Sequence, residues 1–153
     1  MHKVSVIVST YNWPEALEMV LQSLIDQKDR NFEVIVADDG SGPETANTII
    51  RMQKKSPVPI KHFWQEDMGY RLSRVRNGAI KIAEGDIVVF TDGDCCLLPD
   101  FVSNHRKVAE PGCFVTGKRV FLKRRFTEFV MKKRFSFHKW PRILLFMLGL
   151  MGQ

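Results

Sequence analysis

The chain has 153 residues, of which 44% are hydrophobic and 26% are charged, and its formal net charge is +6. This composition is that of one soluble globular domain with a sizeable core, and it excludes a disordered or fibrous chain. The three cysteines, of which Cys95 and Cys96 are adjacent, do not make a disulfide framework, and because the first residues lead directly into an apolar run we expect no signal peptide. We therefore expect a reducing, cytoplasmic environment.

The first expected elements are a buried strand, a loop and a helix. Residues 4–8 form an unbroken run rich in β-branched side chains, too short for a helix, which predicts a strand buried on both faces. The polar segment 9–12 follows it. Asn12 is expected to cap a helix that has Pro14 in its first turn and apolar residues at helical spacing as far as Ile25.

The same strand–loop–helix pattern repeats twice, and a fourth strand follows. The expected strands cover residues 32–37, 59–64 and 86–91, and the expected helices cover residues 43–54 and 72–83. Regular alternation of strands and helices indicates a parallel sheet. The carboxyl ends of parallel strands share one edge, where ligands bind, so the polar segments 10–12, 38–41 and 91–94 should meet there.

Asp92 and Asp94, separated by Gly93 after the fourth strand, are the candidate metal ligands. Two carboxylates about 4 Å apart repel by roughly 4 kcal/mol at an effective dielectric near 20, so a site that keeps both ionised usually holds a cation. A hard divalent cation that also binds phosphate oxygens fits this pair. The alternative for an isolated motif is an Asp-Gly turn. Cys95 and Cys96 follow directly, but neighbouring strand residues point to opposite faces, so we expect no zinc or redox site there.

Four segments resemble, in this order and spacing, the nucleotide-sugar-binding half of family 2 glycosyltransferases with the GT-A fold. They read VSVIVSTYN, VIVADDGS, QEDMGYRLSRVRNGAI and GDIVVFTDGD, and the resemblance covers about residues 3–120. It implies an α/β fold, a Rossmann-like and mostly parallel sheet flanked by helices, truncated on the acceptor side.

The resemblance also implies roles at the donor nucleotide. Thr10 and Tyr11 correspond to the first loop, where the tyrosine stacks near the base, and Asp39 corresponds to the carboxylate that accepts from a ring N–H. An aromatic ring with a polar tip and a carboxylate acceptor suit these tasks. The alternative for Asp38 and Asp39 is a helix cap or an Asx turn.

The remaining implied roles concern the diphosphate. Asp92 would lie near the ribose and the metal, and Asp94 would bind Mg²⁺ or Mn²⁺. Arg76 matches the arginine of the family's Arg-Asn pair. Since Arg71 and Arg74 share a helix face from which Arg76 is rotated away, not all three can face the cleft, and for Arg74 we expect a solvated helix face.

The charge divides the chain into two expected parts. Residues 1–117 carry 13 basic and 16 acidic side chains, whereas residues 118–153 carry 10 basic side chains against Glu128 alone. We expect a nucleotide-sugar-binding core at 1–117 and a basic, aromatic-rich segment at 118–153, which starts the acceptor half or contacts an anionic membrane surface. Nucleic acid is the least favoured partner. The apolar run 143–151 is too short to span a bilayer, which needs about 20 residues.

The predicted function is glycosyl transfer from a nucleotide-diphosphate sugar, with a UDP-sugar favoured, to a polysaccharide, glycolipid or cell-envelope acceptor. The reaction would be metal-dependent and inverting, and the protein would lie in the cytoplasm or on the inner face of the cytoplasmic membrane. A nucleotidyltransferase would need a glycine-rich loop after the first strand, which segment 9–13 is not.

The catalytic base is not identifiable. The carboxylates that follow Asp94 are Asp100, Glu110 and Glu128, and none resembles the family's base motif. The alternative function is therefore a non-catalytic module that binds a nucleotide-sugar or a membrane and lacks the base.

Overall fold

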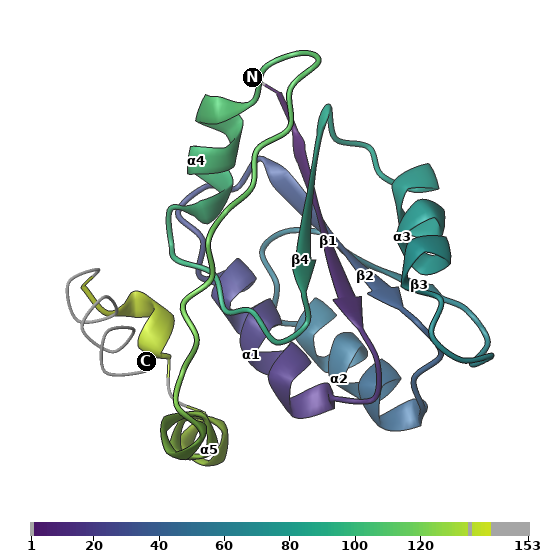
Figure 1. The fold of residues 1–153 in the computed structure, drawn as a ribbon, viewed down its shortest axis with the longest axis vertical. Coiled ribbons are helices and arrows are strands. Elements are labelled where there is room, and N and C mark those ends of the chain that lie inside the picture. The colour runs from purple at the N-terminus through teal and green to yellow at the C-terminus, as the bar shows by residue number, and fades with distance from the viewer. Residues whose placement is uncertain (1, 135, 142–153) are drawn as a thin grey trace.

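The computed structural model of the protein describes residues 2–134 and 136–141. A four-stranded sheet lies at its centre, with helices on both faces (Figure 1). The elements in chain order are β1 (Val4–Thr10), α1 (Pro14–Ile25), β2 (Phe32–Asp38), α2 (Pro43–Gln53), β3 (Ile60–Trp64), α3 (Leu72–Lys81), β4 (Ile87–Asp92), α4 (Phe101–Val108), α5 (Arg124–Lys133) and a short 3₁₀ helix, η1 (Phe137–Lys139). The expected alternation of strands and helices is confirmed as far as β4.

The strand order is β3-β2-β1-β4, and all three pairings are parallel. The register pairs Thr10 with Asp38 and Ser9 with Asp92, so the polar residues at the carboxyl ends of three strands lie at one edge of the sheet. Every residue of β1 and β2 is buried. This burial explains their continuous apolar sequences, because both faces of these central strands are covered.

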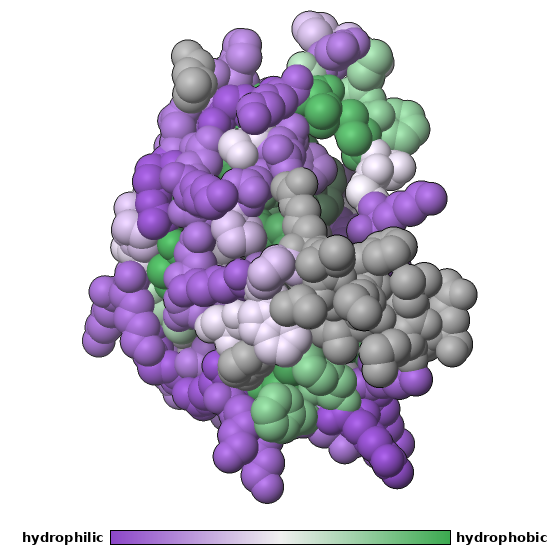
Figure 2. Space-filling view, turned by 90° about the vertical axis from the view of Figure 1, so that its left-hand side faces the viewer, coloured by the Kyte–Doolittle hydropathy of each residue, from purple (hydrophilic) through white to green (hydrophobic). Residues whose placement is uncertain are grey.

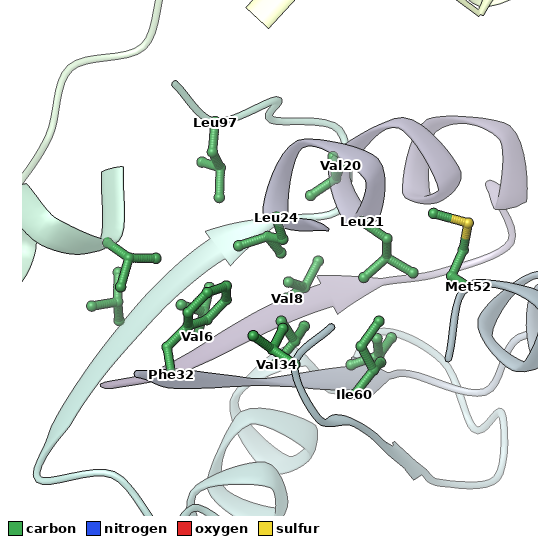
Figure 3. Packing of buried hydrophobic residues seen from close by; sticks show 14 of the residues in the cluster. Val6, Val8, Val20, Leu21, Leu24, Phe32, Val34, Met52, Ile60 and Leu97 are labelled. Atoms are coloured by element: carbon green, nitrogen blue, oxygen red, sulfur yellow. The ribbon is translucent and has the colours of Figure 1, made fainter. Parts of the chain in front are cut away.

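Alternate residues of β1 face two different hydrophobic clusters, as the two-residue period of a strand requires. Val6 and Val8 pack with α1, α2 and α4 in the larger cluster, where Figure 3 shows Leu21 and Leu24 of α1 directed at the sheet. Ile7 faces the opposite way, toward α3. The smaller cluster is formed by Ile7, Ile35, Ala37, Val75 and Ala79.

Helix α3 covers less of the sheet than its sequence predicts. Val75 and Ala79 are buried, but Ile80, expected on the same face, is 41% exposed. On this side of the sheet, Val88 and Phe90 of β4 are also 37% and 45% exposed. The reason is that α3 packs over β1, β2 and β3, so β4 extends past it.

A buried carboxylate joins the strands at the amino end of the sheet. Glu33 of β2 is fully buried, and its Oε1 accepts hydrogen bonds from the Ser5 hydroxyl (2.7 Å) and from the Glu84 backbone amide (2.6 Å). Its Oε2 lies 2.8 Å from the Lys61 ammonium. Gly85 donates to Ser5 Oγ, and a side chain at Gly85 would lie 2.6 Å from the Ser5 amide. The turn into β4 is thereby held against β1.

The same contacts shift the pKa values of two carboxyls downward. Burial alone would raise the pKa of Glu33, but hydrogen bonds from Lys61, the Glu84 amide and Ser5 hold it below its ordinary value. The exposed Glu84 accepts from Lys3 and Lys61, which lower its pKa from 4.5 to about 2. A carboxyl with a lower pKa in the folded state stabilises the fold above its unfolded pKa, and that contribution is lost as the pH falls.

We therefore predict that the free energy of unfolding falls as the pH is lowered below about 4.5, the ordinary pKa of both carboxyls, with the buried Glu33 contributing more than the exposed Glu84, whose ion pairs are screened by solvent. Glu33→Gln should reduce the free energy of unfolding at pH 7 by about 2 kcal/mol, because the Lys61 ammonium is then left beside a neutral buried group. Urea titrations at pH 7, 4.5 and 3 measure both effects.

Glu84→Gln is the control for the exposed member of this network and should have a much smaller effect at pH 7, since surface ion pairs contribute little. The loss caused by Glu33→Gln should shrink as the pH falls, because the wild-type carboxylate is itself protonated there. An equal loss at all three pH values would contradict the ionic role of Glu33.

Candidate functional site

A cleft of about 610 Å³ opens at the carboxyl edge of the sheet. Its lining comes from the ends of β1, β2 and β4, from the start of α3 and from the loop before α3, and consists of Ser9, Thr10, Tyr11, Asp39, Gly69, Tyr70, Leu72, Arg76 and Asp92. All five residues predicted for the donor nucleotide line this one cleft. Asp94 does not; it lines a smaller neighbouring groove with Trp13 of the first loop and Met131 of α5.

Asn12 links the first two loops and does not cap α1, so the expected capping role is wrong. The residue before α1 is Trp13, and no side chain caps the helix. Asn12 has a left-handed backbone (φ 46°), which asparagine tolerates better than most residues. Its side-chain Oδ1 accepts a hydrogen bond from the Gly42 backbone amide, and its backbone amide donates to Ser41 Oγ, both at 2.9 Å. The loops after β1 and β2 are thus fixed to each other.

Asp38 stabilises the loop that follows β2. It is fully buried; its Oδ1 accepts from the Ser41 amide at 2.8 Å, and its Oδ2 lies 3.0 Å from His62 Nε2. The Ser41 contact is the Asx-type alternative considered from the sequence. Gly40 follows with φ 97°, and a Cβ there would lie 2.5 Å from the Asp67 Cα. Only glycine fits where the loops after β2 and β3 meet.

Asp39 holds both ends of the loop between β3 and α3. Its Oδ1 accepts from the Gln65 side-chain amide, and its Oδ2 accepts from the Arg71 backbone amide at 2.8 Å. A carboxylate oxygen has two lone pairs, so each oxygen can accept one more hydrogen bond. Asp39 therefore shapes the cleft and still has capacity for a ligand N–H.

Two tyrosines face the cleft from different loops. Tyr11 donates to Asp67 Oδ2 at 2.8 Å, and this hydrogen bond together with the aspartate charge raises the pKa of Tyr11. Tyr70 is 86% exposed and also lines the cleft. The sequence reasoning did not single out Tyr70, although an aromatic residue within the polar run 65–71 was a usable signal.

Arg76 is fixed at the cleft by three partners. Its Nε donates to Ser9 Oγ (2.8 Å), its Nη2 donates to Asp92 Oδ1 (2.9 Å), and its guanidinium lies over the Phe90 ring, 5.6 Å from the centroid. The neighbouring arginines do not line the cleft. Arg71 donates to the Glu66 carbonyl, and Arg74 is exposed.

Asp92 is bound by a second arginine that the sequence reasoning missed. Arg119 donates from Nη1 to Asp92 Oδ2 at 2.9 Å, 27 positions along the chain. It lies in residues 113–123, which form neither helix nor strand. No local pattern links it to Asp92.

Carboxylate oxygens of Asp92 and Asp94 lie close enough together for both residues to be ligands of one divalent cation. Ligand atoms of Asp92, Asp94 and Cys95 all lie within 4.8 Å of one another. Gly93 allows this turn, since a Cβ there would lie 2.8 Å from the Ser9 carbonyl. Cys95 lies just after β4 and not in a strand, so the alternation argument against a zinc or redox site at Cys95 and Cys96 does not apply there. Burial and the nearby Asp94 raise the pKa of its thiol, which favours the protonated form.

The described part of the basic segment is attached to α1. Asp26, at the end of α1, lies 2.9 Å from His138 and 3.1 Å from Lys139, and Glu18 lies 3.3 Å from Arg134. The apolar run 143–151 lies outside the described residues. No helix in the described ranges is long and apolar enough to cross a membrane.

No carboxylate that follows Asp94 lines the cleft. Asp100 precedes α4 and pairs with Lys28 at 2.9 Å, Glu128 pairs with Arg124 at 2.9 Å on the surface of α5, and Glu110 is exposed. The described lining of the cleft therefore contains no carboxylate from the part of the chain that follows Asp94.

Comparisons with known proteins agree with this geometry. The family model of glycosyl transferase family 2 matches residues 5–151. Validoxylamine A glucosyltransferase of Streptomyces hygroscopicus subsp. jinggangensis is 34% identical over 103 residues, and hyaluronan synthase of Pasteurella multocida is 38% identical over 108 residues. These alignments cover 66% and 70% of this chain, but only 24% and 11% of the relatives.

Solved structures share the fold. The mannosyltransferase PcManGT of Pyrobaculum calidifontis, in complex with GDP-Man and Mn²⁺, superposes with a TM-score of 0.65 and 31% identity over 72% of this chain and 33% of that one. TarS 1-349 of S. aureus, in complex with UDP-GlcNAc, superposes with a TM-score of 0.60 and 27% identity. This superposition covers 75% of this chain and 37% of the TarS chain. With a parallel sheet that gathers its loops into one cleft, this chain has the GT-A fold and belongs to glycosyl transferase family 2.

Proposed function

We propose that this chain forms the donor-binding part of a metal-dependent, inverting glycosyltransferase that uses a nucleotide-diphosphate sugar and a saccharide or lipid-linked acceptor of a polysaccharide or cell-envelope pathway. The observation that carries this proposal is the single cleft in which Tyr11, Asp39, Arg76 and Asp92 meet. It combines an aromatic face, a hydrogen-bond acceptor, a cation and a carboxylate, the groups that a base, a ribose and a diphosphate require.

The base would lie between the first loop and the loop before α3. Tyr11 and Tyr70 offer aromatic faces, and Asp39 has the remaining acceptor capacity for a ring N–H. Uracil and guanine both carry a ring N–H, whereas cytosine and adenine do not. The solved relatives hold GDP-Man and UDP-GlcNAc, and a UDP-sugar is the donor that we propose for this chain.

The diphosphate would lie toward Asp92 and Asp94, which would hold Mg²⁺ or Mn²⁺. Such an ion supplies positive charge against the departing nucleoside diphosphate. Arg76 supplies a fixed charge at the same place, because Ser9 and Phe90 hold its guanidinium before a substrate arrives. Preorganised charge is worth more than charge that must reorient during the reaction.

A non-catalytic nucleotide-sugar-binding module is the second candidate. It is favoured by one observation, the lack of any carboxylate after Asp94 in the lining of the described cleft. Donor hydrolysis or sugar transfer by the chain would support the glycosyltransferase. Metal-dependent binding of the donor without turnover would support the non-catalytic module.

Asp94→Asn should weaken Mn²⁺-assisted binding of UDP by more than tenfold, about 1.4 kcal/mol, because the amide is a poorer ligand for a hard cation. The exposed side chain should tolerate the change without unfolding. Calorimetric titration with Mn²⁺ and with a chelator measures the effect, and Glu128→Gln, which removes an acid distant from the cleft lining, is the control. Equal wild-type affinity in chelator would rule out metal dependence.

Asp39→Ala should reduce the preference for UDP over CDP, because only uracil donates a ring N–H to the carboxylate. The loss of the loop contacts must be separated from the loss of this hydrogen bond. Gln65→Ala removes a loop contact and leaves Asp39 in place, so it should weaken UDP and CDP equally. A base preference that survives Asp39→Ala would show that another group reads the base.

We also propose that the basic segment contacts an anionic membrane on the cytoplasmic side. Lys123, Arg125, Lys132 and Lys133 are exposed around α5, and Phe121 and Phe129 are 76% and 50% exposed. Figure 2, which shows the left-hand side of Figure 1, has a largely hydrophilic surface with smaller hydrophobic areas where the described residues are visible. Each basic residue near an anionic surface adds about 1 kcal/mol of attraction.

The chain should therefore sediment with phosphatidylserine-containing vesicles and not with neutral ones, and the double substitution Lys132→Glu with Lys133→Glu should greatly reduce binding. Lys54→Glu with Lys55→Glu, an equal charge change after α2, is the matched control. Raising the salt from 0.1 M to 1 M shortens the Debye length from about 10 Å to about 3 Å and should release the protein. Binding that is indifferent to vesicle charge would refute the electrostatic contact.

A further inference from the structure

We propose that Arg119 is a diphosphate-binding residue, which exchanges Asp92 for the phosphates of the donor when the donor binds. The proposal rests on the proposed function, because it assigns one more residue to the same donor site. Its basis is the ion pair between Arg119 and Asp92, a residue that lines the cleft.

The two arginines at Asp92 are held in different ways. Arg76 is fixed by Ser9 and Phe90 as well as by Asp92, and its side chain is 28% exposed. The side chain of Arg119 is 60% exposed, and it contacts Asp92 Oδ2 and the ring of Phe121, whose centroid is 5.7 Å away. Arg76 is thus a fixed charge, whereas Arg119 can turn without breaking buried contacts.

The ion pair is of a kind that exchanges readily. Both partners are partly exposed, at 60% and 43%, and exposed ion pairs contribute little net free energy. A diphosphate presents several charged oxygens and accepts two parallel hydrogen bonds from one guanidinium. The phosphates are therefore the stronger partner for Arg119, and Asp92 Oδ2 becomes available for the ribose or a cation.

The backbone keeps Arg119 within reach of the cleft. Figure 1 shows its segment running from α4 alongside the sheet to α5. One end is attached through α4, where the Val102 amide donates to Gln27, and the other end through α5 and η1, where His138 meets Asp26. Arg119 lies in the irregular span between these two attachments, so its side chain can adjust while its distance from the cleft stays limited.

The test is calorimetric titration of the full chain with UDP and with GDP, in Mn²⁺ and in chelator. Arg119→Ala should weaken binding of whichever nucleotide the wild type binds about tenfold in both conditions. The affinity of Arg119→Lys should lie between those of the wild type and Arg119→Ala, because an ammonium keeps the charge but cannot donate two parallel hydrogen bonds to the phosphates. Arg124→Ala is the matched control, because it removes the same charge from a side chain that is 93% exposed and paired with Glu128.

Trypsin digestion gives a second readout that does not depend on affinity alone. Lys118 and Lys123 flank Arg119 in the irregular segment. Saturating nucleotide should slow cleavage at these lysines in the wild type and in Arg124→Ala. It should not slow cleavage in Arg119→Ala, even at concentrations that saturate that variant.

Unchanged affinity and unchanged protection in Arg119→Ala would overturn the proposal. Tighter binding in Arg119→Ala would also overturn it, because Arg119 would then compete with the donor for Asp92. If the wild type binds neither nucleotide, the proposed function fails and the role of Arg119 fails with it. If the wild type binds and only the Arg119 predictions fail, the proposed function stands.

Discussion

The parallel register of β1 with its two neighbours is the constraint on which the site depends. Pairing Thr10 with Asp38 and Ser9 with Asp92 brings three loops to one edge, although their residues are widely separated in sequence. A register slip of one residue would turn the alternating side chains of β4 to the other face. The buried Glu33 contacts oppose such a slip, because they fix the turn before β4 to both central strands. The contacts at the amino end of the sheet thus help to keep the register that brings the loops together at the carboxyl end.

Adjacent aspartates in this fold do different work because their surroundings differ. Asp38 is fully buried and completes its own loop, whereas Asp39 is next to the cleft and holds the loop before α3. Asp92 and Asp94 diverge in the same way, since Asp92 lies between two arginines in the cleft and Asp94 lines the neighbouring groove. Residue type gives each carboxylate its chemistry, but the tertiary partners decide which task it performs.

The sequence predicted the core of this fold well, because buried parallel strands and amphipathic helices are encoded by local patterns. Boundaries were less certain: α3 ends at Lys81, two residues before the predicted end. The cap expected at Asn12 failed, since its side chain is used by a partner 30 residues away. Arg119 was missed for the same reason, because its partner is non-local and its segment has no periodicity. The roles of Thr10, Tyr11, Asp39, Arg76, Asp92 and Asp94 remain predictions.

The uneven distribution of charge along the chain produces ion pairs between its acidic and basic parts. In the part of the chain that the structure describes, the acidic core and the basic segment form ion pairs at Glu18 and Asp26, in and just after α1, and at Asp92 in the cleft. The boundary between residues 117 and 118 remains a prediction about domain organisation, and these ion pairs join residues on its two sides. A segment that is anchored by Glu18 and Asp26 can leave its exposed lysines facing an anionic surface while Arg119 pairs with Asp92 of the cleft. Because the first contact places the segment and the second places a charge beside Asp92, the same electrostatic complementarity would serve both the proposed membrane contact and the proposed binding of the donor.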